Sequence, residues 1–269
     1  MKPYFSYSSN HQIWRIQITD SDKLILETRD MDSKEVYFHC VDLTDSSIIF
    51  ENFQLEEKHW IGIESIYKDI IFFHRFPKPD MPGHKEVTAF DISSQKILWN
   101  NEDLSFLFAF GDKVYCFKQG FEERYFYSLD ILTGELKEEL GDNYQLLNNI
   151  RNDAESKKDW SVYGYPKSMS EAEGLIVEVI NKYSSGYEIA GEIEFNTYKN
   201  YLMFNFHSKT KEGSFDNHFY LIDLDSRKVL NDEILNKNAS SLFKDAFFVY
   251  KNFLFLLKEK NEVLIFNLE

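Results

Sequence analysis

The sequence has few of the features that would assign it to a specialised class of protein. Only two of its 269 residues are cysteines, so disulfides cannot form a framework, and we expect Cys40 and Cys116 to be buried free thiols in a reducing compartment. No run approaches the roughly 18 apolar residues of a membrane-spanning helix, and the N-terminus has no apolar stretch of signal-peptide length. These absences predict a cytoplasmic protein with no membrane partner.

Basic residues are also scarce. The chain has 30 Lys and Arg against 45 Asp and Glu, which gives a formal net charge of −15. No Lys/Arg cluster interrupts this acidic composition, so the average field of the protein would repel a phosphate backbone. We therefore expect no nucleic-acid partner.

Local catalytic motifs are missing as well. The sequence has no Gly-x-Ser-x-Gly elbow, P-loop, Gly-x-Gly-x-x-Gly or His-Glu-x-x-His. Catalytic groups contributed by separate strands leave no local spacing, so this absence lowers the expectation of an enzyme without removing it. From the sequence we predict no catalytic residue and no cofactor, with a bound quinone as a further alternative.

Aromatic residues, by contrast, are abundant at 17%, with 25 Phe and 16 Tyr, and they favour half-buried pleated surfaces. They recur in a repeated phrase whose clearest copy is Lys85–Trp99, KEVTAFDISSQKILW. Alternation on both sides of a Ser-Ser-Gln turn predicts a β-hairpin, and Asp91 can accept hydrogen bonds from backbone N–H groups of the turn. Further copies begin at Glu35, Arg124, His218 and Glu262.

The predicted strands group into four-stranded antiparallel units of roughly 40 to 45 residues, the length typical of propeller blades. The units cover residues 13–53, 60–100, 104–139, 191–232 and 243–268. The last unit lacks a fourth strand, and we expect the N-terminal strand at residues 3–7 to supply it, closing the ring and covering open sheet edges. The predicted fold class is thus an all-β propeller in a single domain, residues 1–269.

The long interval between Asp130 and Asp223 leaves room for a sixth blade, so six blades are the alternative to five. We favour an insertion at residues 141–187 that carries one helix at about 171–183. Ser170-Glu171-Ala172-Glu173 has the spacing of a capping box, and apolar residues follow at helical spacing. The segment 143–161 before it is polar and rich in turn residues.

The phrase Ala89–Trp99 resembles the tryptophan-docking repeat of quinoprotein-like (PQQ-like) propellers, and Leu129–Glu135 has the Asp-x-x-Thr-Gly turn of that repeat without its Trp. The whole chain is also similar to an uncharacterised family of Bacteroidetes propeller-type proteins. That similarity lies in Ile13–Ile16, Glu27–Asp30 and Tyr165-Pro166. Both resemblances imply a continuous propeller, and neither implies an activity.

Charged residues at the ends of predicted second strands are the candidate binding groups. Alternation puts Glu27 and Arg29 on one face of their strand. There they form either a clamp for a carboxylate or phosphate, or an ion pair that ties two blades together. We favour the ion pair. Arg75 has the equivalent register in the second blade, next to His74. The loop Phe76–Glu86 holds three of the five prolines and is either a preformed binding surface or a plain surface loop.

His74 and His84 could meet across this loop as two metal ligands. A zinc site needs three or four such groups, and only Asp80 and Glu86 lie close by in the sequence, so we expect no metal site.

Trp14 and Trp60 occupy similar places in predicted first strands, and Trp160 lies in the insertion. For these rings we expect a packing role in the blades, or in pinning the insertion, rather than a role as a stacking platform.

The function that these patterns favour is a non-catalytic binding or interaction module for a protein segment or a small ligand. Its candidate binding residues are Glu27, Arg29, His74, Arg75 and His84. The alternative is a propeller enzyme, a hydrolase or lyase acting on a sugar-like or acidic small molecule through some of the same side chains. If these side chains are paired at blade seams, the hypothesis of an open binding site loses support.

Overall fold

The structure, a computed structural model, describes residues 1–77 and 83–269. Within these residues the strands form five antiparallel sheets of four or five strands, accompanied by two α-helices. The predicted fold class, all-β with four-stranded propeller-type blades, is confirmed, and the sheets number five rather than six. The middle of the proline-rich loop, including Asp80, lies outside the described residues.

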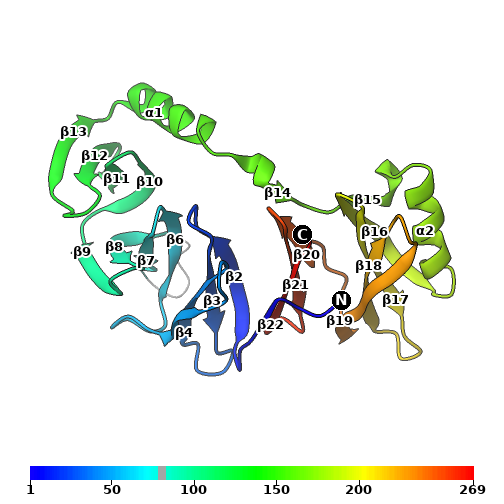
Figure 1. Cartoon of the computed structure of the whole chain (residues 1–269). Coiled ribbons are helices and arrows are strands. Elements are labelled where there is room, and N and C mark those ends of the chain that lie inside the picture. Colours follow the sequence, from blue (N-terminus) through cyan, green and yellow to red (C-terminus); the bar gives the residue numbers. More distant parts are fainter. Residues whose placement is uncertain (78–82) are drawn as a thin grey trace. The chain divides into compact units, whose positions relative to one another are not determined.

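The described residues divide into two compact units. The unit His11–Lys158 contains three sheets, each a four-stranded meander in sequence order (Figure 1). The first sheet is β2 (Gln12–Ile18), β3 (Lys23–Arg29), β4 (Val36–Asp42) and β5 (Ile48–Phe53). The second is β6 (Ile61–Tyr67), β7 (Ile70–Arg75), β8 (Lys85–Asp91) and β9 (Lys96–Asn101). The third is β10 (Ser105–Phe110), β11 (Lys113–Gln119), β12 (Arg124–Asp130) and β13 (Leu136–Gly141).

Apolar side chains fill the spaces between neighbouring sheets of this unit. Phe38 of the first sheet packs with Phe73 and Phe90 of the second. Between the second and third sheets, Trp99 is buried and its indole Nε1 donates a hydrogen bond to the carbonyl oxygen of Ile131 at 3.0 Å. The predicted docking tryptophan therefore ties one blade to the next, because burial of its ring is combined with a satisfied N–H group.

One glycine is required by this tryptophan. Gly134, in the Thr-Gly turn between β12 and β13, has φ +72°, and a Cβ added there would lie 2.6 Å from two atoms of the Trp99 ring. Only glycine meets both demands, the left-handed backbone and the close approach of the indole.

A helix that the sequence reasoning did not predict follows the third sheet. α1 (Tyr144–Ser156) begins at Asn143, whose side chain accepts a hydrogen bond from the N–H of Leu146. The predicted single helix in the insertion is therefore wrong, because there are two. α1 buries only Leu147 and Ala154, so its sequence is polar enough to resemble a turn-rich loop. Two signals could have revealed this helix: the N-cap residue Asn143 and the seven-residue spacing of the two buried positions.

The second unit consists of residues 1–10 and 159–269 and contains two five-stranded sheets. One has the order β15 (Lys167–Ser168), β16 (Ile189–Tyr198), β17 (Tyr201–Lys209), β18 (Phe215–Asp223) and β19 (Lys228–Ala239). The other has the order β1 (Phe5–Ser8), β22 (Glu262–Asn267), β21 (Phe253–Lys258), β20 (Phe247–Tyr250) and β14 (Tyr163–Gly164). Met203 and Phe219 of the first pack with Leu254 of the second.

The predicted pairing of the N-terminal strand with the last strand is confirmed. β1 lies antiparallel to β22, with Phe5 opposite Ile265, and so supplies the fourth strand that the C-terminal hairpins lack. The backbone groups of β22 are thus paired on both sides, and the edge of the sheet is the four-residue strand β1.

The helix α2 (Leu175–Ser184) lies against β16 to β18 and buries Val179 and Ile180 (Figure 1). The predicted helix is confirmed, but it begins at Leu175 and not near residue 171. Ser170 instead lies in a short 3-10 turn, Met169–Glu171, so the predicted capping box is wrong, and Gly174 with φ 55° precedes α2.

The cysteines are buried, whereas three of the four tryptophans are exposed. Cys40 and Cys116 are buried free thiols, as predicted. Trp14 and Trp60 are exposed at 51% and 40%, so the predicted packing role in the blades is wrong for these two rings. Trp160 is 58% exposed and its ring contacts that of Tyr163, and its role in pinning the insertion stays a prediction. For Trp14 the reason is a β-bulge: the pairing of β2 with β3 shifts between Ile13 and Arg15, so the bulged residue falls out of the alternation.

Candidate functional site

The predicted pair Glu27 and Arg29 forms on β3, on the side of the first sheet that faces the second. The Glu27 carboxylate is fully buried, and its Oε1 accepts hydrogen bonds from Nε and Nη2 of Arg29 at 2.9 and 2.7 Å. The Arg29 guanidinium also lies 4.7 Å from the centre of the Trp14 ring. Both groups of the pair are thus occupied by each other, which is the arrangement of a structural ion pair.

The pair also fixes the neighbouring sheet. Glu27 Oε2 accepts a hydrogen bond from the backbone N–H of Ile63 at 3.1 Å, and Arg15 donates through Nη1 to the carbonyl oxygen of the same residue. Two side chains of the first sheet therefore hold both backbone groups of one residue of β6. This bears out the interpretation that Glu27 and Arg29 tie two blades together.

The residue after Ile63 is Glu64, and it is the extra residue of a β-bulge. Gly62 is paired with His74 and Ile63 with Phe73, whereas the next pair is Ser65 with Phe72. A bulge redirects the side chain of the additional residue. Glu64 is thereby brought to the two histidines of the second sheet.

Glu64, His74 and His84 form a compact group that we call the histidine cluster. Glu64 Oε2 lies 2.9 Å from Nδ1 of His74 and 2.6 Å from Nδ1 of His84. The two imidazole rings are stacked, with centroids 3.6 Å apart and planes 8° from parallel. One donor atom from each of the three residues lies within 4.8 Å of the others. The predicted meeting of His74 and His84 is therefore confirmed, and Glu64 is the member that sequence reasoning missed.

His74 occupies the buried end of the cluster. Its side chain is 2% exposed, while those of Glu64 and His84 are 21% and 39% exposed. Across from it, a Cβ added to Gly62 would lie 3.2 Å from His74 Cε1 and 3.6 Å from Arg29 Nη2, so the lack of a side chain at Gly62 leaves room for both. The edge-on ring of Phe76 lies 4.8 Å from the His74 ring.

Burial determines the protonation of the cluster. It lowers the pKa of the His74 imidazole, and the nearby Glu64 carboxylate only partly opposes this effect. For Glu64, burial by itself raises the carboxyl pKa, but the contacts with His74 and His84 outweigh burial and lower it. The cluster at neutral pH thus combines a carboxylate with a neutral imidazole at His74.

Arg75, the remaining predicted site residue, lies outside this cluster. Its Nε is 3.3 Å from Oε2 of Glu86, a buried carboxylate at the start of β8. Arg29 and Arg75 end equivalent strands, as predicted, but each is paired with its own glutamate. The structure thus brings His74 and His84 together, places Arg29 beside them across Gly62, and assigns Arg75 to a separate ion pair.

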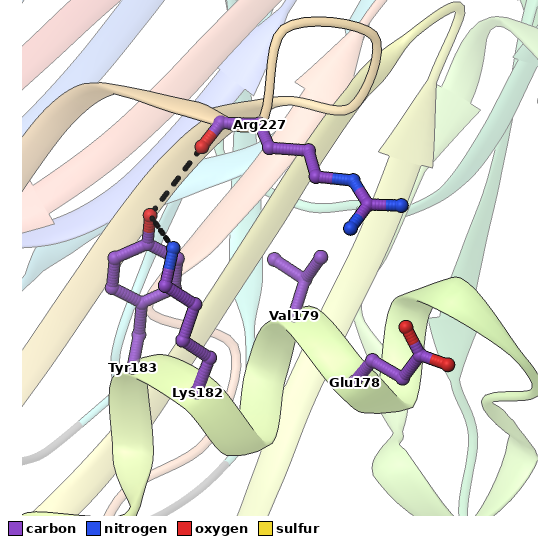
Figure 2. A pocket seen from close by; sticks show the side chains of 5 residues that line it. All are labelled: Glu178, Val179, Lys182, Tyr183 and Arg227. Atoms are coloured by element: carbon purple, nitrogen blue, oxygen red, sulfur yellow. Dashed lines mark hydrogen bonds between the residues drawn. The ribbon is translucent and has the colours of Figure 1, made fainter.

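A second candidate site lies in the other unit, between α2 and the turn that joins β18 to β19. It is a pocket of about 230 Å³ lined by Glu178, Val179, Lys182, Tyr183 and Arg227 (Figure 2). Lys182 Nζ donates to the Tyr183 hydroxyl at 3.4 Å, and that hydroxyl donates to the carbonyl oxygen of Arg227 at 3.5 Å. Both hydrogen bonds are long, so an incoming polar group can displace them at small cost.

Figure 2 shows the Arg227 side chain extended over Val179, with its guanidinium above the helix. The pocket therefore has an apolar floor and two cationic groups at its rim.

Sequence comparison finds a family model that matches part of the chain. Residues 18–99 match the family described as "Domain of unknown function (DUF4905)". The matched segment runs from the end of β2 to β9 and contains Glu27, Arg29 and the whole histidine cluster. No curated protein matches the chain. Neither helix in the described residues has the length and apolar character required to cross a membrane.

Structure comparison finds propellers among the solved structures. A crystal structure of a eukaryotic initiation factor aligns with TM-score 0.35 and 7% identity over 96% of this chain, which spans 52% of that protein. The Dos1 propeller aligns with TM-score 0.34 and 11% identity over 97% of this chain and 72% of its own. The β-propeller domain of the Trilobed protease from Pyrococcus furiosus aligns with TM-score 0.34 and 13% identity. That alignment covers 96% of this chain and 69% of the protease domain. The propeller-type fold of this chain is established by the strand order of its own sheets.

Proposed function

We propose that the chain is a non-catalytic binding module that holds an acidic side chain of a protein or peptide partner in the pocket beside α2. The size of this pocket carries the proposal. At about 230 Å³ it is smaller than the roughly 300 to 1,000 Å³ of pockets that enclose small-molecule substrates, but it is large enough for one side chain. Arg29 and Arg75 are already engaged by Glu27 and Glu86, which leaves the pocket beside α2 as the better candidate for ligand binding.

The charge of the pocket selects the kind of side chain. Lys182 and Arg227 contribute two positive charges and Glu178 one negative charge, and the described residues place no carboxylate within ion-pair distance of the Arg227 guanidinium. A planar guanidinium binds a carboxylate through two parallel N–H bonds. An Asp or Glu side chain with its methylene groups over Val179 would satisfy both the apolar floor and the cationic rim.

Selection from a display library of random dodecapeptides tests this function. We expect binders of the full chain to be enriched in Asp or Glu at one position. Arg227→Gln should weaken their binding by about 10-fold, since a hydrogen bond to a charged group is worth about 1.5 kcal/mol or more. The matched control is Lys211→Gln, an exposed cation in the β17–β18 turn, which should bind like the unchanged chain. Binders without acidic enrichment, or equal binding by Arg227→Gln, would refute the proposal.

Three further predictions belong with this proposal. The assignment of residues 1–269 to a single propeller domain stays a prediction. Two buried free cysteines support a cytoplasmic location. The similarity of the hairpins to quinoprotein-like repeats, and of the chain to a Bacteroidetes family, stays a prediction.

A further inference from the structure

We propose that Glu64, His74 and His84 bind a divalent transition-metal ion, with zinc as the representative ion. The three residues come from β6, the end of β7 and the segment before β8, and each offers one donor atom within 4.8 Å of the others. Two imidazoles and one carboxylate form the protein ligand set of zinc sites that keep an open fourth position. This site is independent of the pocket beside α2.

The buried member of the cluster supports a ligand role. His74 is 2% exposed, and among the described residues neither of its ring nitrogens makes a hydrogen bond. Its Nδ1 is close to Glu64 Oε2 at 2.9 Å, but the contact lacks the direction of a hydrogen bond. A buried polar atom without a hydrogen bond is costly, and a ring nitrogen of His74 that donates its lone pair to a metal ion would be relieved of this cost.

The geometry determines which residue must move. The lone pairs of the two stacked rings lie in two nearly parallel planes, with the ring centroids 3.6 Å apart, so one ring has to turn before both nitrogens face the same ion. His84 is able to turn because its side chain is 39% exposed, whereas His74 is held by burial and by the edge of Phe76. Glu64 and His84 both reach the surface, so the open coordination position faces solvent.

The donor set also selects the class of ion. Imidazole suits Zn²⁺, Co²⁺, Ni²⁺ and Cu²⁺, whereas Mg²⁺ and Ca²⁺ require oxygen ligands and a larger coordination number than this cluster supplies. Binding would join β6, β7 and the segment entering β8 through one ion. The expected consequence is a metal-dependent increase in the melting temperature of the full chain.

The test is zinc titration of the full chain after treatment with a chelator, in competition with a chromophoric zinc indicator. We expect one zinc ion per chain. His84→Ala and Glu64→Gln, which change partly exposed residues, should weaken binding by roughly 10-fold or more. The matched control is His59→Ala, because His59 Nδ1 also lies near a carboxylate, 3.9 Å from Glu57 Oε1, but belongs to no three-residue cluster in the described part of the chain. This control should bind zinc like the unchanged chain.

A second readout uses Co²⁺, whose visible spectrum should show the absorption of a nitrogen- and oxygen-coordinated ion in the unchanged chain and lose it in His84→Ala. Absence of a saturable zinc site, or equal zinc affinity in His84→Ala, would overturn the proposal. Displacement of zinc by millimolar Mg²⁺ would overturn the assignment to transition metals. A failure of this site leaves peptide selection at the α2 pocket unaffected, so the two proposals fail separately.

Discussion

Removing either charge of the Glu27–Arg29 pair should destabilise the protein, and removing Arg29 should cost more. The reason is the difference in exposure between the partners. Glu27 is fully buried, whereas the Arg29 side chain is 23% exposed. In Arg29→Gln the carboxylate remains buried without its cation and keeps only the hydrogen bond from Ile63, whereas in Glu27→Gln water can solvate the released guanidinium.

The expected magnitudes follow from this difference. Breaking a buried ion pair by deleting one partner costs about 3 to 5 kcal/mol. We expect Arg29→Gln to cost about 4 kcal/mol, in the middle of that range, and Glu27→Gln to cost about 2 kcal/mol, below it, because Arg29 regains part of its hydration. The double variant should cost less than the sum of the two single variants, since neither charge is then left alone.

Urea unfolding at neutral pH, followed by tryptophan fluorescence and by circular dichroism, measures these free energies of unfolding. The control is Lys118→Gln, which removes an ion pair with Asp103 whose side chains are 54% and 80% exposed, and it should cost less than about 0.5 kcal/mol. If Arg29→Gln costs less than about 1 kcal/mol, or less than Glu27→Gln, the pair does not hold a buried charge in the way described.

Two further predictions concern the packing and the pH dependence of stability. Gly134→Ala should cost about 3 kcal/mol or more in calorimetric unfolding, because its Cβ would meet Trp99 at 2.6 Å. Gly111→Ala, at φ +67° with open space around it, should cost only about 1 kcal/mol, and equal costs would contradict the role of Trp99. Burial lowers the pKa of His39 from 6.5 to about 4, so the unfolded chain binds more protons between these values and stability is lost as pH falls from 6.5 to 4. That difference corresponds to about 3 kcal/mol, and His39→Gln should flatten this part of the stability curve in urea unfolding, whereas an unchanged slope would show that other groups cause it.

The tautomer of His39 follows from its hydrogen bonds. Its Nδ1 accepts from the backbone N–H of Asn52 at 3.1 Å, so the proton lies on Nε2, which donates to Thr28 Oγ1 at 2.9 Å. A protonated ring could not accept the first bond, which is why the neutral form is favoured in the folded protein.

The sequence alone determined the blades. Alternation around turn residues is a local property, so the hairpin Lys85–Trp99 was recognisable from its own residues, and β8 and β9 form there. The same local reasoning placed Glu27 beside Arg29, because residues two apart on a strand share a face. It also identified the unpaired N-terminal strand, since a missing strand at one end and a spare one at the other are visible in the pattern. The pairing of Glu27 with Arg29 was thus predictable, whereas the hydrogen bond from Ile63 to Glu27 was not.

The tertiary structure decided what the side chains meet. A bulge in β6 turns Glu64 toward His74, and a bulge in β2 leaves Trp14 exposed; strict alternation predicts neither, because one extra residue reverses the faces that follow it. The helix α1 escaped prediction because only two of its residues are buried, so its pattern is mostly polar. The histidine cluster depends on cross-strand register, which brings residues 10 and 20 positions from Glu64 to one carboxylate oxygen. Local sequence specifies strands and turns through backbone preferences, whereas the meeting of distant side chains depends on how the sheets pair and pack.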